Sequence, residues 1–172
     1  DGGALHVSGP NIMTGYYHLS QPETLDPVAS ELGPGWYNTG DVVQVDREGF
    51  IHIIGRVKRF AKVAGEMVSL ETVERLAWTT SPAHRHASTA LSDPRRGESL
   101  ILFTTDPALT REGLLVSARQ LGIPELAVPK RILHFDDIPC LGTGKTDYVT
   151  LNSIASRVAE KPVLDDSFAA EV

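Results

Sequence analysis

Alternating hydrophobic and polar positions predict that the first third of the chain is built from short strands. Residues 5–9 alternate between glycine-containing turns, whereas residues 20–35, with three prolines and two glycines, are expected to form a surface loop. A hairpin follows, with a strand over 42–45, a turn over 46–49 and a return strand over 50–54. It would place Asp41 at the start of one strand and Arg56 just past the end of its partner, so the two side chains are expected to lie close together.

A helical pattern begins after a cationic segment at 55–66. Ser69 is a predicted N-cap for a helix over 70–78, and a second helix over 110–121 is expected to end at Gly122. The positions of these helices predicted to face inward are Leu70, Val73, Leu76 or Ala77, Leu114, Leu115, Ala118 and Leu121. The remaining elements are expected as strands over 86–92, 98–105 and 131–135 and a helix over 150–160. This order predicts an α+β fold with a mostly antiparallel sheet of three strands packed by helices.

The pattern divides the chain into two units and a tail. Residues 1–56 are expected to form a small β-rich piece, and residues 57–160 the unit that contains the helices. Residues 161–172 lack periodicity and are expected to form a loose tail. Because the chain starts at Asp1 in mid-pattern, without a methionine, we expect it to be a fragment of a longer protein.

Composition and charge narrow the function classes. The chain of 172 residues is 41% hydrophobic, and its net charge of −6 argues against a general nucleic-acid binder. No apolar run is long enough to predict a membrane span. The single cysteine, Cys140, excludes an internal disulfide and is expected to be a small apolar filler. Cations cluster at Lys58, Arg59, Lys62, Arg95, Arg96, Lys130 and Arg131. Such clusters suit a specific anionic ligand or an acidic protein partner, or they are only solvated faces.

Two features carry candidate chemistry. A carboxylate and a guanidinium at adjacent strand ends, Asp41 and Arg56, are suited to a vicinal diol such as a ribose, although a surface salt bridge is the alternative. The second feature is the loop 141–146, in which two glycines flank Thr143 and precede Lys145. Pro139 argues against a phosphate-binding P-loop, because such a loop needs glycine at that position. Taken alone, Lys145 could be an exposed lysine on a flexible turn.

Four segments together resemble the C-terminal part of the acyl-adenylate-forming superfamily, which includes acyl-CoA synthetases, peptide-synthetase adenylation domains and firefly luciferase. The segments, in chain order, are 2–16, 35–41, 55–65 and 144–145. Residues 58–71 and 143–151 most resemble the bacterial bifunctional 2-acylglycerophosphoethanolamine acyltransferase/acyl-[acyl-carrier-protein] synthetases. The resemblance implies that residues 1–56 end a large N-terminal domain and that residues 57–160 form a C-terminal lid domain.

The resemblance also implies roles for single residues. Asp41 would bind the ribose hydroxyls of ATP with help from Arg56, and Tyr37 and Thr39 would line the same ATP site. Magnesium would accompany ATP, held mainly by the large domain, and no metal ligand is expected in this chain.

Other residues would serve the movement of the lid. Lys58 occupies the place of the superfamily's hinge residue, about which the lid would turn between two half-reactions. Lys145 would be the catalytic lysine of adenylation, in which a carboxylate attacks the α-phosphorus of ATP and pyrophosphate leaves. Gly65 and Glu66 would face the phosphopantetheine arm of the thiol acceptor.

The resemblance implies a longer enzyme that activates a fatty acid and transfers it to acyl carrier protein for reacylation of 2-acylglycerophosphoethanolamine, at the cytoplasmic side of the bacterial inner membrane. The alternatives are an ordinary fatty acyl-CoA ligase and a non-catalytic binding module. One departure is Tyr148, which stands where many members carry arginine. Because the phosphate loop and the acyl pocket of the large domain are absent, we expect this soluble fragment alone to be inactive.

Overall fold

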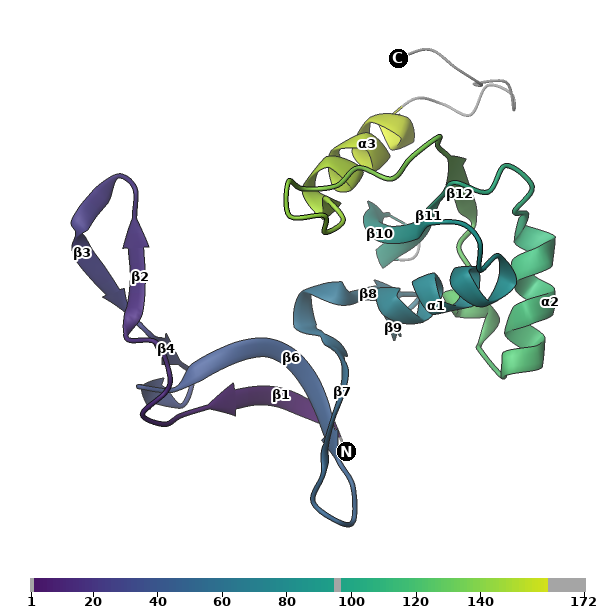
Figure 1. Cartoon of the computed structure of the whole chain (residues 1–172). Coiled ribbons are helices and arrows are strands. Elements are labelled where there is room, and N and C mark those ends of the chain that lie inside the picture. The colour runs from purple at the N-terminus through teal and green to yellow at the C-terminus, as the bar shows by residue number, and fades with distance from the viewer. Residues whose placement is uncertain (1, 95–96, 161–172) are drawn as a thin grey trace. The chain divides into compact units, whose positions relative to one another are not determined.

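The computed structural model describes residues 2–94 and 97–160, and the chain divides into two compact units, one ending at Phe60 and one beginning at Ala61 (Figure 1). The tail predicted over 161–172, and the cations Arg95 and Arg96, lie outside the described residues. The α+β class and the mostly antiparallel pairing are confirmed.

The first unit consists of short antiparallel strands. They are β1 (Gly2–Val7), β2 (Gly15–His18), β3 (Gln21–Pro27), β4 (Ala29–Ser30), β5 (Gly33–Pro34), β6 (Tyr37–Val45) and β7 (Ile51–Arg56). The main sheet has the order β1-β6-β7, while β2 pairs with β3 and β4 with β5. The predicted hairpin is confirmed as β6 and β7, but its first strand begins at Tyr37, so Asp41 lies within the strand rather than at its start.

The surface loop predicted for residues 20–35 is wrong, because this segment contains β3, β4 and β5. The prolines misled the prediction. Pro27 lies at the end of β3 in a two-stranded ladder, where a missing N–H costs little. All residues of β3 are exposed, so no burial pattern marked the strand.

Within the described residues, the second unit has one sheet and three α-helices. Its elements are β8 (Phe60–Val63), β9 (Glu66–Ser69), α1 (Leu70–Thr80), β10 (His86–Asp93), β11 (Gly97–Thr104), α2 (Arg111–Leu121), β12 (Arg131–His134) and α3 (Tyr148–Glu160), with a 3-10 turn η2 (Glu125–Ala127). The sheet has five strands in the order β10-β11-β8-β9, with β12 parallel to β11. The prediction of three strands was wrong because β8 and β9 were interpreted as a junction.

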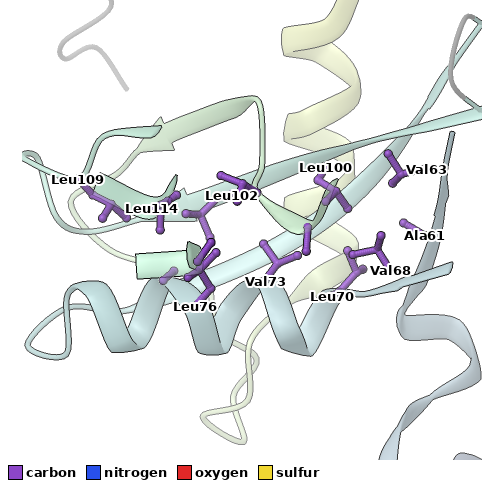
Figure 2. Packing of buried hydrophobic residues seen from close by; sticks show 14 residues of the cluster. Ala61, Val63, Val68, Leu70, Val73, Leu76, Leu100, Leu102, Leu109 and Leu114 are labelled. Carbon is purple, nitrogen blue, oxygen red and sulfur yellow. The ribbon is translucent and has the colours of Figure 1, made fainter. Parts of the chain in front are cut away.

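The helices cover the two faces of the sheet (Figure 1). Leu100 and Leu102 of β11 face the cluster built by α1 and α2, where Figure 2 shows Val73 and Leu76 of α1 pointing at them. The alternate residues of β11, Ile101 and Phe103, face α3 instead.

Most of the predicted inward positions are confirmed. Leu70, Val73, Leu76 and Ala77 are buried on α1, and Leu114 and Ala118 on α2. Leu121, in contrast, is 48% exposed, because α2 ends there. Gly122 ends this helix as predicted, with φ of 66° in the left-handed region. The predicted N-cap, Ser69, holds the N-cap position, but its hydroxyl makes no capping bond.

Candidate active site

Asp41 and Arg56 meet across the β6–β7 ladder. They are register partners and form an ion pair, in which Arg56 Nε lies 3.0 Å from Asp41 Oδ1. The carboxylate is the less accessible partner, with 16% of its side chain exposed against 65% for the guanidinium. Within the described residues, Asp41 Oδ2 has no hydrogen-bond partner. This arrangement leaves one carboxylate oxygen and several guanidinium N–H groups available to a ligand.

A β-bulge in β6 contains Asp41. Ala4 of β1 pairs with Val42 of β6, and His6 pairs with Asn38. Between these two pairs, β1 has one residue, Leu5, whereas β6 has three, residues 39–41, so β6 forms a bulge. Side chains of the segment close the bulge, since Thr39 Oγ1 donates to the Leu5 carbonyl and accepts from the Asp41 N–H, both at 3.0 Å. Gly40 has φ of 74°, which explains the glycine. Thr39 therefore holds the backbone that carries Asp41.

Tyr37, at the start of β6, faces Tyr16. The pKa of the Tyr16 phenol is raised because it forms a hydrogen bond with Tyr37. Tyr37 pairs with Val7 and is half-buried. The structure therefore gathers Tyr37, Thr39, Asp41 and Arg56 along β6 and the end of β7.

Lys58 lies in a 3-10 turn, η1 (Val57–Arg59), between β7 and β8. Its side chain is exposed, and the two compact units separate soon after it, between Phe60 and Ala61.

Gly65 and Glu66 lie at a tight turn of the second unit. Ala64 and Gly65 join β8 to β9 with φ of 52° and 92°, and positive φ at both positions is the requirement of a type I′ hairpin turn. No atom lies within 4 Å of a Cβ built on Gly65. The backbone conformation alone therefore accounts for glycine at this position, and Glu66 follows it exposed on β9.

Lys145 lies in a small hairpin that leads into α3. Cys140 and Thr146 form an antiparallel bridge, the Leu141 N–H donates to the Lys145 carbonyl at 2.8 Å, and Gly144 turns the chain with φ of 81°. Within residues 2–94 and 97–160, the Lys145 ammonium has no hydrogen-bond or ion-pair partner. The loop thus has a hydrogen-bonded backbone and carries an exposed cation without a partner among the described residues.

Two groups brace this hairpin. Asp147 caps α3, because its Oδ1 accepts from the backbone N–H groups of Val149 and Thr150, both at 3.1 Å. The hydrogen bond from Thr150, and to a lesser extent that from Val149, lowers the pKa of Asp147. At the start of the hairpin, Arg85 donates to Asp137 Oδ1 at 2.6 Å and to Cys140 Sγ at 2.7 Å.

These contacts correct the sequence prediction for Cys140. It is exposed and accepts a hydrogen bond from Arg85, so the prediction of a small apolar filler was wrong. Sequence reasoning also missed Arg85 and Asp137, because contacts between residues so far apart in the sequence leave no local pattern. Contact with Cys140 and Asp137 raises the pKa of Arg85 further above its ordinary value, so the guanidinium stays charged.

Comparison with known proteins points to one group of enzymes. The chain is 30% identical over 147 residues to the long-chain-fatty-acid–CoA ligase of Salmonella typhimurium, which covers 84% of this chain and 25% of that protein. It is 31% identical over 157 residues to triostin synthetase I of Streptomyces triostinicus, covering 90% of this chain and 29% of the relative. The chain therefore spans between a quarter and a third of the length of these relatives. No protein-family profile matches it.

Solved structures agree with the sequence relatives. The amide bond synthetase McbA of Marinactinospora thermotolerans superimposes with a TM-score of 0.69 at 29% identity, over 90% of this chain and 31% of that chain. The sequence relatives and this structural neighbour are thus ligases and synthetases, of which this chain matches one part.

Proposed function

We propose that the chain is the C-terminal part of an ATP-dependent ligase that activates a carboxylic acid as its acyl-adenylate and then passes the acyl group to a thiol. The observation that carries this proposal is the braced hairpin with its unpaired Lys145, in a chain whose relatives are ligases of this kind.

The β6–β7 hairpin would hold the nucleoside. Asp41 Oδ2 would accept from a ribose hydroxyl while Arg56, which forms an ion pair with the same carboxylate, donates with its guanidinium N–H groups. Thr39 would act by holding the bulge, and Tyr37 by lining the same side of the strand. A half-buried carboxylate in a rigid bulge fits a diol better than a freely moving surface ion pair does.

Lys145 would act in the first half-reaction. A carboxylate oxygen of the acid forms a bond to the α-phosphorus of ATP, the bond to the bridging oxygen breaks, and pyrophosphate leaves with the electron pair. Negative charge gathers on the non-bridging oxygens in this step, and an ammonium that is not already paired can stabilise it.

The second half-reaction would use a different face of the second unit. Lys58 in η1 would be the hinge, and the Ala64–Gly65 turn with Glu66 would then meet the phosphopantetheine arm. Residues 1–56 would belong to the large domain and 57–160 to the lid. Magnesium would accompany ATP and would be held mainly by the large domain; the described residues contain no group of three or more His, Cys, Asp or Glu side chains that could hold a metal ion.

The surface of β7 supports the proposal that this chain is part of a larger body. Ile51, Ile53 and Ile54 are 56%, 66% and 45% exposed, and the described residues of the first unit bury only Val28 and Val43 among their hydrophobic side chains. Such a small core rarely stabilises a unit alone. The remainder of the enzyme would cover this strand.

Two thiol acceptors are candidates. The fatty-acid–CoA ligase among the relatives supports coenzyme A with a long-chain fatty acid. The likeness of residues 58–71 and 143–151 to bifunctional synthetases supports acyl carrier protein, with 2-acylglycerophosphoethanolamine as the final acceptor at the inner membrane. An acidic carrier would suit the cations Arg59 and Lys62. Among the described residues, no helix is long and apolar enough to span a membrane.

The test uses the intact enzyme. Purified protein is assayed for acid-dependent ATP–pyrophosphate exchange, and acyl transfer is then compared with coenzyme A and with acyl carrier protein as acceptors. Exchange that depends on a long-chain fatty acid supports the proposal, and the faster acceptor decides between the candidates. Absence of exchange with every acid tested would refute the adenylation function and favour a binding module.

A further inference from the structure

The first residue of α3 is tied to α1 on the opposite face of the sheet. Glu74 of α1 accepts at Oε1 from the Tyr148 hydroxyl at 3.2 Å, and its Oε2 lies 3.4 Å from the same hydroxyl. The same Oε1 accepts from the backbone N–H of Ser88 at 2.7 Å. One carboxylate thus joins α1, β10 and α3.

This link passes around an edge of the sheet. β10 is an edge strand, paired only with β11 among the described strands. The Ser88 N–H donates to Glu74 instead of to another strand, so Glu74 covers the edge. Since the Ser88 hydroxyl also donates to the Leu70 carbonyl at 2.9 Å, the strand and the start of α1 form a firm base for the carboxylate.

The backbone between Lys145 and Tyr148 is hydrogen-bonded to the segment 139–141. The Asp147 N–H donates to the Pro139 carbonyl at 2.9 Å, Thr146 forms the bridge with Cys140, and the Lys145 carbonyl accepts from Leu141. Every residue between the lysine and the tyrosine is therefore held by its backbone. A displacement of Tyr148 would therefore be transmitted along this backbone to the Lys145 hairpin.

The polar link is not needed to attach α3. Leu151 and Ala155 are fully buried against Ala87, Ile101 and Phe103, and this apolar contact docks the helix. The Glu74–Tyr148 contact lies at the N-terminal end of α3, three residues after Lys145.

We propose that Tyr148 and Glu74 are positioning residues that orient the Lys145 hairpin for adenylation. This inference rests on the proposed function, because it assigns them an effect only through Lys145.

The experiment replaces the phenol hydroxyl alone, as Tyr148→Phe, in the intact enzyme. Loss of one hydrogen bond to a carboxylate is expected to lower kcat of ATP–pyrophosphate exchange by roughly tenfold, with the KM for ATP unchanged. Transfer to the thiol from supplied acyl-adenylate should keep its rate, since that step does not use Lys145. The matched control is Tyr17→Phe, which removes the phenol hydroxyl of a tyrosine that is 70% exposed and should change neither rate.

A second arm repeats Tyr148→Phe and Glu74→Gln in a Lys145→Ala background. If both residues act through the lysine, neither substitution should lower the remaining exchange rate further. Equal losses in both half-reactions, or additive losses in the Lys145→Ala background, would show a merely structural role and overturn the inference. If Lys145→Ala loses only ATP–pyrophosphate exchange while Tyr148→Phe keeps normal rates, the inference is wrong but the role proposed for the lysine stands. If Lys145→Ala is fully active, both the role proposed for the lysine and the inference are refuted.

Discussion

Leu151 of α3 offers the sharpest stability prediction, because this helix carries the candidate lysine hairpin. The side chain is fully buried in the cluster with Ala87, Ile101, Phe103, Ile138 and Ala155. Leu151→Ala removes three carbon groups at roughly 0.8 kcal/mol each, about 2.4 kcal/mol. Two of the neighbours are alanines, which cannot extend into the space, so a cavity contribution should raise the loss to about 3–4 kcal/mol.

Urea unfolding of the 172-residue chain, followed by the helical circular dichroism signal, measures this loss. All three α-helices of the described residues belong to the second unit, so the signal reports on that unit. With a urea dependence of about 1.5 kcal/mol per M, the midpoint should fall by about 2–2.7 M. Val149→Ala, on the same helix at a position 82% exposed, is the matched control and should shift stability by less than about 0.5 kcal/mol. Equal effects of the two variants would refute the packing of α3 described above.

Three further predictions concern single residues of the candidate site. Gly65→Ala should destabilise the second unit by about 1–2 kcal/mol through its positive φ, whereas Gly142→Ala, with equally open space, should be nearly neutral in the same urea assay. Equal effects of these two substitutions would contradict the turn geometry. The lowered pKa of Asp147 means that its stabilisation of α3 is fully present above the ordinary carboxyl pKa and is lost as the pH falls through the lower folded pKa. A carboxyl NMR titration that gives an ordinary pKa for Asp147 would contradict the cap. In the intact enzyme, Asp41→Asn should raise the KM for ATP by about 10- to 100-fold, and an unchanged KM would exclude ribose binding by this carboxylate.

The fold was predictable where burial imposed a period. The apolar positions of α1 follow from one buried face. Strand β11 is covered on both faces, so its buried residues form a continuous run over 100–104. The predicted bounds of α1, β10 and β11 were close to those observed. Strands β8 and β9 were not predicted because they are short. In addition, the Ala64–Gly65 turn between them lacks the Asn-Gly or Asp-Gly pair that marks such hairpins.

The candidate site was predictable where its residues lie on the two strands of one hairpin. Asp41 and Arg56 could be brought together from the register of a single turn. The contact of Glu74 with Tyr148 joins helices on opposite faces of the sheet, and that of Arg85 with Cys140 joins distant loops, so neither could be inferred from local spacing. From the sequence, Tyr148 was noticed only because many members of the resembling superfamily have arginine at this position. The structure shows that its hydroxyl donates to Glu74.

The central claim is that Lys145 serves adenylation and not thiol transfer. The direct measurement is Lys145→Ala in the intact enzyme, with Lys130→Ala, another exposed lysine of the second unit, as the matched control. We predict a loss of ATP–pyrophosphate exchange of about 100-fold or more for Lys145→Ala, normal transfer from supplied acyl-adenylate, and normal rates in both assays for Lys130→Ala. Normal exchange in Lys145→Ala, or an equal loss in both half-reactions, would contradict the account.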